Sequence, residues 1–224
     1  MATRTLGHVT VTLPELDEPG LYLANVVTLD SPRGIVQDFA YSDADLRSLE
    51  LADTRLITGR VSGVRSKRVA FEAVSLHGVE IVGSDLGSVR WSGGKLTRVV
   101  LRDCRLTGAA LAGITLDDVL FESCKLDYAT FEKVRATGPV AFADCALDEA
   151  VFTDCDLSDV VFSACPLKRT EFGPGRYQDT DLRGNDLSDI RGAGNLSKVR
   201  IGHGQQAELG EALMSELAIT VGDD

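Results

Sequence analysis

The chain has 224 residues, 44% of them hydrophobic, and a formal net charge of −11 from 23 Lys and Arg against 34 Asp and Glu. Its length fits one domain with short terminal additions. No stretch approaches eighteen consecutive apolar residues, and the N-terminus does not have the charged and apolar segments of a secretion signal. We therefore expect a cytoplasmic protein that does not bind membranes.

Residues 1–43 are expected to be irregular. Two apolar, strand-like stretches occur at residues 8–13 and 21–29. Proline and glycine break up the segment at Pro14, Pro19, Gly20, Pro32 and Gly34. Because a regular repeat follows, we predict that this segment is an N-terminal cap or an irregular first coil of the repeat.

Apolar residues recur at every fifth position from Leu46 onward. Of the eighteen positions from Leu46 to Phe131, seventeen carry large hydrophobic residues, and Ser66 is the exception. One extra residue enters near residues 137–141, and the series then resumes at Phe142 and runs to Leu187. A period of five fits neither an α-helix nor a single strand, so it indicates a structural repeat.

Two inward slots per unit are expected from this pattern. A small residue stands two positions before each large one, as Cys124 does before Leu126, and the other three slots are mostly polar. A unit of this kind cannot bury its apolar face alone, so units must stack. Large aromatic residues recur twenty positions apart, as Phe71 and Trp91 do, which predicts coils of twenty residues.

Units such as residues 124–128 (CKLDY) and 155–159 (CDLSD) resemble the pentapeptide-repeat family, whose consensus is A(D/N)LXX. The resemblance covers residues 44–191. It implies an all-β fold, a right-handed four-sided parallel β-helix with one unit on each side, followed here by a short C-terminal α-helix. A right-handed crossing is also the usual one between parallel strands.

All five cysteines fall in the small inward slot. They are Cys104, Cys124, Cys145, Cys155 and Cys165. Their odd number and the missing signal peptide argue against disulfides, and no CxxC motif or histidine in their column suggests a metal site. We predict reduced, buried thiols that pack as small hydrophobic groups.

The C-terminal segment, residues 192–224, is predicted to hold one helix at about residues 205–218. Leu209, Leu213 and Leu217 form an apolar stripe together with Met214. One stripe covers one surface, so the helix either plugs the end of the β-helix or pairs with a second chain. In several members of the family a C-terminal helix joins two rods end to end, and that resemblance makes a homodimer through these four residues one of the two expectations.

The charge of the predicted rod is uneven along its length. Residues 44–105 hold 11 Lys and Arg against 7 Asp and Glu, a net of +4, whereas residues 106–191 hold 8 against 16, a net of −8. Five aspartates of the acidic half are expected to share one side and to contact a partner: Asp117, Asp118, Asp156, Asp159 and Asp179. The alternative is that they form an ordinary solvated surface.

Enzymatic chemistry is not expected. None of His8, His77 and His203 stands at a motif spacing from a nucleophile or a carboxylate. Residues 202–207 (GHGQQA) imitate a phosphate loop but are not followed by the required βαβ unit. We therefore predict no catalytic, cofactor or metal site.

Two functions remain open for a non-catalytic β-helix. The topoisomerase-protecting branch of the family, with the Qnr and MfpA proteins, resembles B-DNA in girth and acidity and occupies the DNA-binding surface of DNA gyrase. The resemblance implies DNA mimicry, a gyrase partner, antibiotic resistance and no direct contact with nucleic acid. The alternative is a generic protein–protein interaction scaffold.

Overall fold

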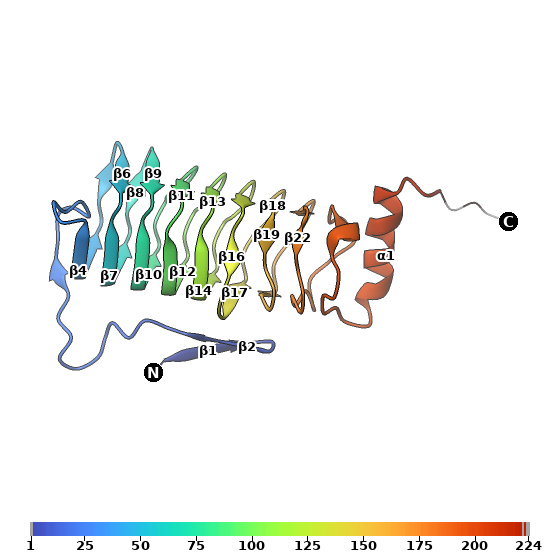
Figure 1. The fold of residues 1–224 in the computed structure, drawn as a ribbon, viewed down its shortest axis with the longest axis horizontal. Helices are drawn as coiled ribbons and strands as arrows, with labels where there is room; N and C mark the ends of the chain where they lie inside the picture. Colours follow the sequence, from blue (N-terminus) through green and yellow to red (C-terminus); the bar gives the residue numbers. More distant parts are fainter. Residues whose placement is uncertain (1, 221, 223–224) are drawn as a thin grey trace.

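Coils of twenty residues stack on one another through parallel strands. The computed structural model describes residues 2–220 and 222, and it is a parallel β-solenoid of about seven coils with one C-terminal helix (Figure 1). Leu76 lies opposite Leu96, and Leu96 lies opposite Leu116, so the register advances by twenty residues per coil. The predicted all-β solenoid and its period are confirmed.

Each coil has four sides, which we call A to D in chain order. The large inward residues that define them are Leu76, Leu96 and Leu116 on side A; Ile81, Leu101, Phe121, Phe142 and Phe162 on side B; Leu86, Leu106, Leu126 and Leu147 on side C; and Trp91, Leu111, Phe131 and Phe152 on side D. All of them are buried.

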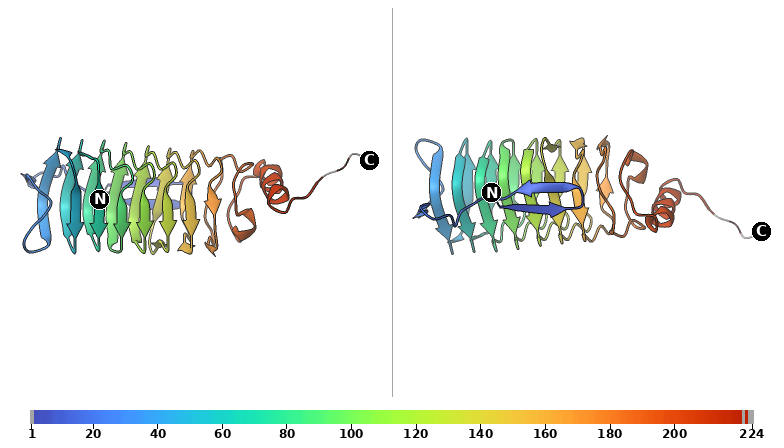
Figure 2. Two further views of the ribbon diagram at one scale, coloured as in Figure 1. Left: turned by 90° about the horizontal axis from the view of Figure 1, so that it is seen from above. Right: turned by 90° about the horizontal axis from the view of Figure 1, so that it is seen from below.

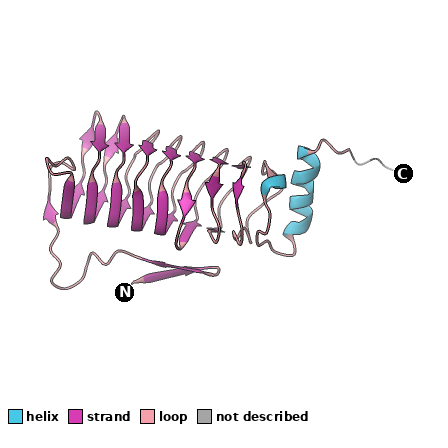
Figure 3. Cartoon of the chain, viewed as in Figure 1, coloured by secondary structure: helices cyan, strands magenta, loops and turns pink. Residues whose placement is uncertain are grey.

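An eleven-stranded sheet forms sides A and B, and a seven-stranded sheet forms side D (Figures 1 and 3). The larger sheet contains β3 (Ala24–Asn25), β4 (Ile35–Ser42), β7 (Arg55–Ser62), β10 (Ser75–Val82), β12 (Lys95–Arg102), β14 (Thr115–Glu122), β16 (Arg135–Ala136), β17 (Val140–Ala143), β19 (Cys155–Asp156), β20 (Val161–Ser163) and β22 (Gly175–Arg176). The smaller sheet contains β6 (Leu49–Ala52), β9 (Val69–Glu72), β11 (Arg90–Ser92), β13 (Ala110–Ala112), β15 (Thr130–Glu132), β18 (Val151–Thr153) and β21 (Glu171–Phe172). Side C begins with the pair β5 (Asp45–Leu46) and β8 (Arg65–Ser66) and continues as isolated bridges.

The extra residue lies at the corner between sides A and B. Leu116 pairs with Ala136, twenty residues on, whereas Val119 pairs with Val140, twenty-one residues on. The insertion therefore falls between residues 136 and 140, as predicted. A corner accepts it because an extra residue within a strand would turn every later side chain to the opposite face.

Aromatic rings fill the C-terminal half of the core. Phe121, Phe142 and Phe162 of side B stack with ring centroids 4.7 and 4.9 Å apart. Across the core, Phe142 meets Phe131 of side D edge to face, with the centroids 6.0 Å apart. Both geometries are favoured by the ring quadrupoles, so opposite walls are tied together as well as stacked.

The N-terminal segment differs from the expected cap. Residues 24–42 do build an irregular first coil, in which β3 pairs with β4. However, β1 (Thr3–Leu6) and β2 (Val9–Thr12) form an antiparallel hairpin that lies along the outside of the rod, far from its N-terminal end (Figure 2). The hairpin pairs with no strand of the solenoid.

At the other end, the chain forms a 3-10 turn, η1 (Ala193–Asn195), and then α1 (Gln205–Glu216), which lies across the last coil (Figure 1). No helix among the described residues is long and apolar enough to span a membrane.

Truncation of Phe131 tests the importance of the aromatic core. Phe131→Ala should lower the free energy of unfolding by about 3–5 kcal/mol, because the ring is buried and its cavity cannot collapse within stacked coils. Denaturant unfolding followed by circular dichroism measures the loss. The matched control is Thr130→Ala, at the exposed neighbouring position. A loss below about 1 kcal/mol for Phe131→Ala would contradict this packing.

Candidate protein-binding surface

The five predicted aspartates fall in two adjacent places. Asp117 and Asp156 flank the inward residues of side A, whereas Asp118, Asp159 and Asp179 occupy the corner between sides A and B, where each has a positive φ of 55–60°. The structure therefore places them along one edge of the rod and not on the single side that the sequence predicts, and their contact with a partner stays a prediction.

Most of these carboxylates are already paired. Lys95 Nζ lies 2.7 Å from Asp117 Oδ2, and Arg176 Nη1 lies 3.4 Å from Asp156 Oδ2. Arg200 donates to Asp179 at 2.9 Å, and this bond holds the pKa of the Asp179 carboxyl below its usual range. The ion pairs leave less free negative charge along this edge than the amino-acid count suggests.

Side A also carries more cations than carboxylates. Its outward positions include Arg55, Lys95, Arg135 and Arg176, and the register places Asp156 between two of these arginines. The predicted acidic side is therefore mixed in charge, because residues twenty positions apart neutralise one another.

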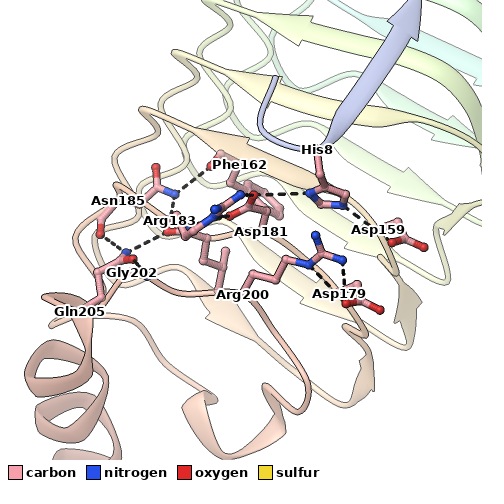
Figure 4. A network of polar contacts seen from close by, with 11 residues as sticks. His8, Asp159, Phe162, Asp179, Asp181, Arg183, Asn185, Arg200, Gly202 and Gln205 are labelled. Atoms are coloured by element: carbon pink, nitrogen blue, oxygen red, sulfur yellow. Dashed lines mark hydrogen bonds and ion pairs between the residues drawn. The ribbon is translucent and has the colours of Figure 1, made fainter. Parts of the chain in front are cut away.

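The hairpin engages the remaining two aspartates of the predicted set. The Thr12 backbone N–H donates to Asp118 Oδ1 at 2.9 Å, and His8 Nε2 lies 3.7 Å from Asp159 Oδ1. The other ring nitrogen of His8 lies 3.4 Å from Asp181 Oδ2 (Figure 4). Part of the predicted partner-binding edge is thus in contact with the chain's own N-terminus.

The sequence interpretation missed an apolar strip beneath this hairpin. Outward positions of side B are aliphatic in successive coils, at Val100, Leu120, Ala141 and Val161, and all four side chains are buried. Val9 and Val11 of β2 cover them. The sequence does contain a sign of this strip, because the same outward position is charged in the two preceding coils, at Arg60 and Glu80, and becomes aliphatic from Val100 onward.

No group of three or more His, Cys, Asp or Glu side chains lies close enough to hold a metal ion among the described residues. The glycine-rich residues 202–207 form a turn in which Gln205 Oε1 accepts the Gly202 N–H at 2.6 Å. The Gly202 N–H, which a phosphate loop would offer to a phosphate, is therefore bound by the side chain of the first residue of α1.

Residues 114–192 match the family model described as a pentapeptide repeat region. This part of the rod is a pentapeptide-repeat region. The match covers the C-terminal four coils of the rod, and the twenty-residue register extends the same architecture to the coils before them. No curated protein matches the chain.

Solved structures of pentapeptide-repeat proteins align with this solenoid. One trypsin-treated form of QnrB1, a plasmid-mediated fluoroquinolone resistance protein, is 16% identical with a TM-score of 0.46, over 82% of this chain and 100% of that one. Full-length QnrB1 is 15% identical with a TM-score of 0.40, over 80% and 89%. HetL, involved in the regulation of heterocyst differentiation in a Nostoc cyanobacterium, is 15% identical with a TM-score of 0.24, over 74% and 86%.

Helix α1 closes the C-terminal end of the pentapeptide-repeat rod with polar side chains. Gln205 Nε2 donates to the carbonyls of Leu182 and Asn185 at 2.9 and 2.6 Å. Glu208 accepts the Leu187 N–H at 3.0 Å, and Glu216 accepts the Gly194 N–H at 3.3 Å. These bonds satisfy backbone groups that a further coil would have paired.

The predicted dimer stripe is divided by this arrangement. Leu209 and Leu213 are partly buried against the solenoid core, and Met214 is half-buried. Leu217 is 66% exposed and Ile219 is 54% exposed. The helix therefore caps the rod with half of its stripe, and dimerisation through the exposed half stays a prediction.

Substitution of Leu217 separates capping from dimerisation. We expect the wild-type chain to be a dimer and Leu217→Asp to be a monomer with a stability within about 0.5 kcal/mol of wild type, because an exposed residue contributes little to the fold. Leu213→Asp, which places a charge against the core, should instead lower the melting temperature. Light scattering and thermal unfolding measure the two effects. A wild-type chain that is monomeric at every concentration would rule out the dimer.

The five cysteines are buried, as predicted, and carry free thiols. Their Sγ atoms contact backbone carbonyls of the preceding coil, as Cys155 Sγ does with Phe131 O at 3.2 Å. Burial raises the pKa of the Cys155 thiol to about 11. The thiolate of Cys155, which is the reactive form, is therefore scarce at neutral pH.

Thiol labelling tests this inward assignment. The native protein should incorporate almost no maleimide or Ellman's reagent at neutral pH within an hour, whereas the protein in guanidinium should react at all five sites, which mass spectrometry counts. Rapid reaction of any native cysteine would show that its side chain faces outward.

Proposed function

We propose that this pentapeptide-repeat protein is a non-catalytic protein-binding scaffold. The observation that supports the proposal is that inward and outward positions of each coil have different roles. The inward slots are used for packing, while the outward slots hold polar side chains on rigid, paired strands. Such flat sides suit recognition of another protein surface, since little backbone freedom has to be lost on binding.

We further propose that the partner is DNA gyrase or a related type II topoisomerase. In this proposal the rod mimics DNA, occupies the DNA-binding surface and protects the enzyme from inhibitors. The net charge of −8 over residues 106–191 favours a basic partner surface. The 86 residues make about 4.3 coils, which at about 4.8 Å each give roughly one net charge per 2.6 Å of rod, against one per about 1.7 Å in duplex DNA. The mimicry would therefore be partial.

The free negative charge favours side C and its corners as the contact surface. Of the described residues, Asp127, Asp144, Asp186 and Asp189 form no ion pair within 4 Å. By contrast, the predicted Asp117, Asp156 and Asp179 are paired with Lys or Arg. A basic partner would displace a cation from each of the paired carboxylates, and this lowers their net contribution to binding.

Supercoiling by purified DNA gyrase tests the proposal, with and without a fluoroquinolone. Wild-type protein at micromolar concentration should inhibit supercoiling or reduce drug-induced cleavage, and the effect should weaken steeply with added salt because exposed charges are screened. Asp127→Lys with Asp189→Lys should abolish the effect, whereas Asp117→Lys with Asp156→Lys should weaken it less. All four positions are outward, so the fold should be kept.

An unaffected gyrase, with and without drug, would exclude the topoisomerase proposal. The scaffold proposal would then stand with a different partner. Equal loss of activity in the two double variants would contradict the preference for side C.

A further inference from the structure

The hairpin of residues 3–12 covers the rod without becoming part of it. Its strands pair only with each other, and it contacts the rod through side chains and through one backbone bond, from the Thr12 N–H to Asp118 Oδ1. Val9 and Val11 pack on the aliphatic strip of Val100, Leu120 and Val161 in a cluster separate from the solenoid core. The core of the rod is therefore complete without the hairpin.

The solenoid also keeps its own ion pairs beneath the hairpin. Arg4 contacts Glu122 at 3.0 Å, but Arg102 Nε already lies 2.7 Å from the same carboxylate. His8 contacts Asp181, which Arg183 Nη2 holds at 2.6 Å (Figure 4). Departure of the hairpin would leave these carboxylates paired and would uncover mainly apolar surface.

The fit between hairpin and strip nevertheless has the features of a specific complex. Val11 is fully buried, whereas the neighbouring Thr10 faces solvent, so alternate residues of β2 contact the rod. At the tip, Gly7 has φ +56° and stands so close to Asp181 that a Cβ would lie 2.9 Å from its Oδ2. Residues 13–23, which include Pro14, Pro19 and Gly20, connect the hairpin to the first coil.

An isolated two-stranded hairpin is marginally stable in water, so this one depends on the rod for its order. If the hairpin leaves the rod as a unit, the core of the rod stays intact. The hairpin then competes with any other polypeptide that binds the surface it covers. Uncovered aliphatic surface of this kind, rimmed by charged groups, is typical of a protein-binding site.

We propose that the strip on side B is a docking groove for an extended segment of a partner protein, and that the N-terminal hairpin is a built-in competitor for it. The hairpin itself defines the partner chemistry: aliphatic residues at alternate positions, with basic residues placed to meet Glu122 and Asp181. This inference rests on the proposed scaffold function and identifies the surface and the kind of segment that it binds.

A labelled peptide with the sequence of residues 2–20 serves as the probe. Wild-type protein should bind it weakly, because the tethered hairpin competes at a high effective concentration. The full-length variant Val11→Asp, whose own hairpin is weakened, should bind the peptide at least tenfold more tightly by fluorescence anisotropy. Thr10→Asp, which changes the exposed face of the same strand, is the matched control and should behave as wild type.

A second substitution locates the bound peptide. Adding Val161→Asp or Leu120→Asp to Val11→Asp should abolish binding, and circular dichroism should show the same solenoid, since both positions point outward. Equal peptide affinity in wild type and Val11→Asp, or binding that survives both strip variants, would overturn the proposal. Formation by Val11→Asp of an oligomer larger than that of wild type, without peptide binding, would also overturn it, with a second copy as the occupant. The assay contains no topoisomerase, so its outcome is independent of the gyrase experiment.

Discussion

The stacking of identical positions at a spacing of about 4.8 Å is the constraint on which the whole rod depends. Each inward side chain must pack against its counterpart one coil away, as Phe131 does against Phe152 with ring centroids 4.6 Å apart. A coil has no core of its own, so its stability comes from its neighbours. This is why the insertion between residues 136 and 140 is confined to a corner. After it, the large inward residues again stack directly on their counterparts in the preceding coil.

The same stacking governs the outer surface. Outward residues twenty or so positions apart are neighbours, and opposite charges in one column pair directly, as in Arg60 with Glu80, Arg102 with Glu122 and Arg105 with Asp85. The free charge of a side therefore depends on which charged residues stack on one another in adjacent coils, and not only on how many of each sign the side contains. A rod with a large formal charge can present mixed sides, and only carboxylates without a cation in the adjacent coils remain available to a partner.

Each end of the chain covers a surface that the repeated coils would otherwise leave exposed. The last coil would expose unpaired backbone groups and apolar core side chains, and α1 covers them with Gln205, Glu208 and Glu216 together with Leu209 and Leu213. The N-terminal hairpin covers a side instead of an end. It converts outward positions, which are otherwise polar, into a second small apolar cluster. One side of the rod is thus covered by a separate hairpin of the same molecule.

Much of the fold could be predicted from the sequence, because the period of five is a local pattern that repeats. The inward residues, including the cysteines, and the place of the insertion all follow from it, and the helix near residues 205–218 follows from a second local pattern, the leucines four positions apart. The pairing of Asp156 with Arg176 also lay within reach, since it joins residues one coil apart. Only the tertiary structure placed the hairpin over Val100, Leu120 and Val161. That contact joins residues about a hundred positions apart through a linker without a pattern of its own, and an aliphatic residue in an outward slot looks the same in sequence whether water or another segment covers it.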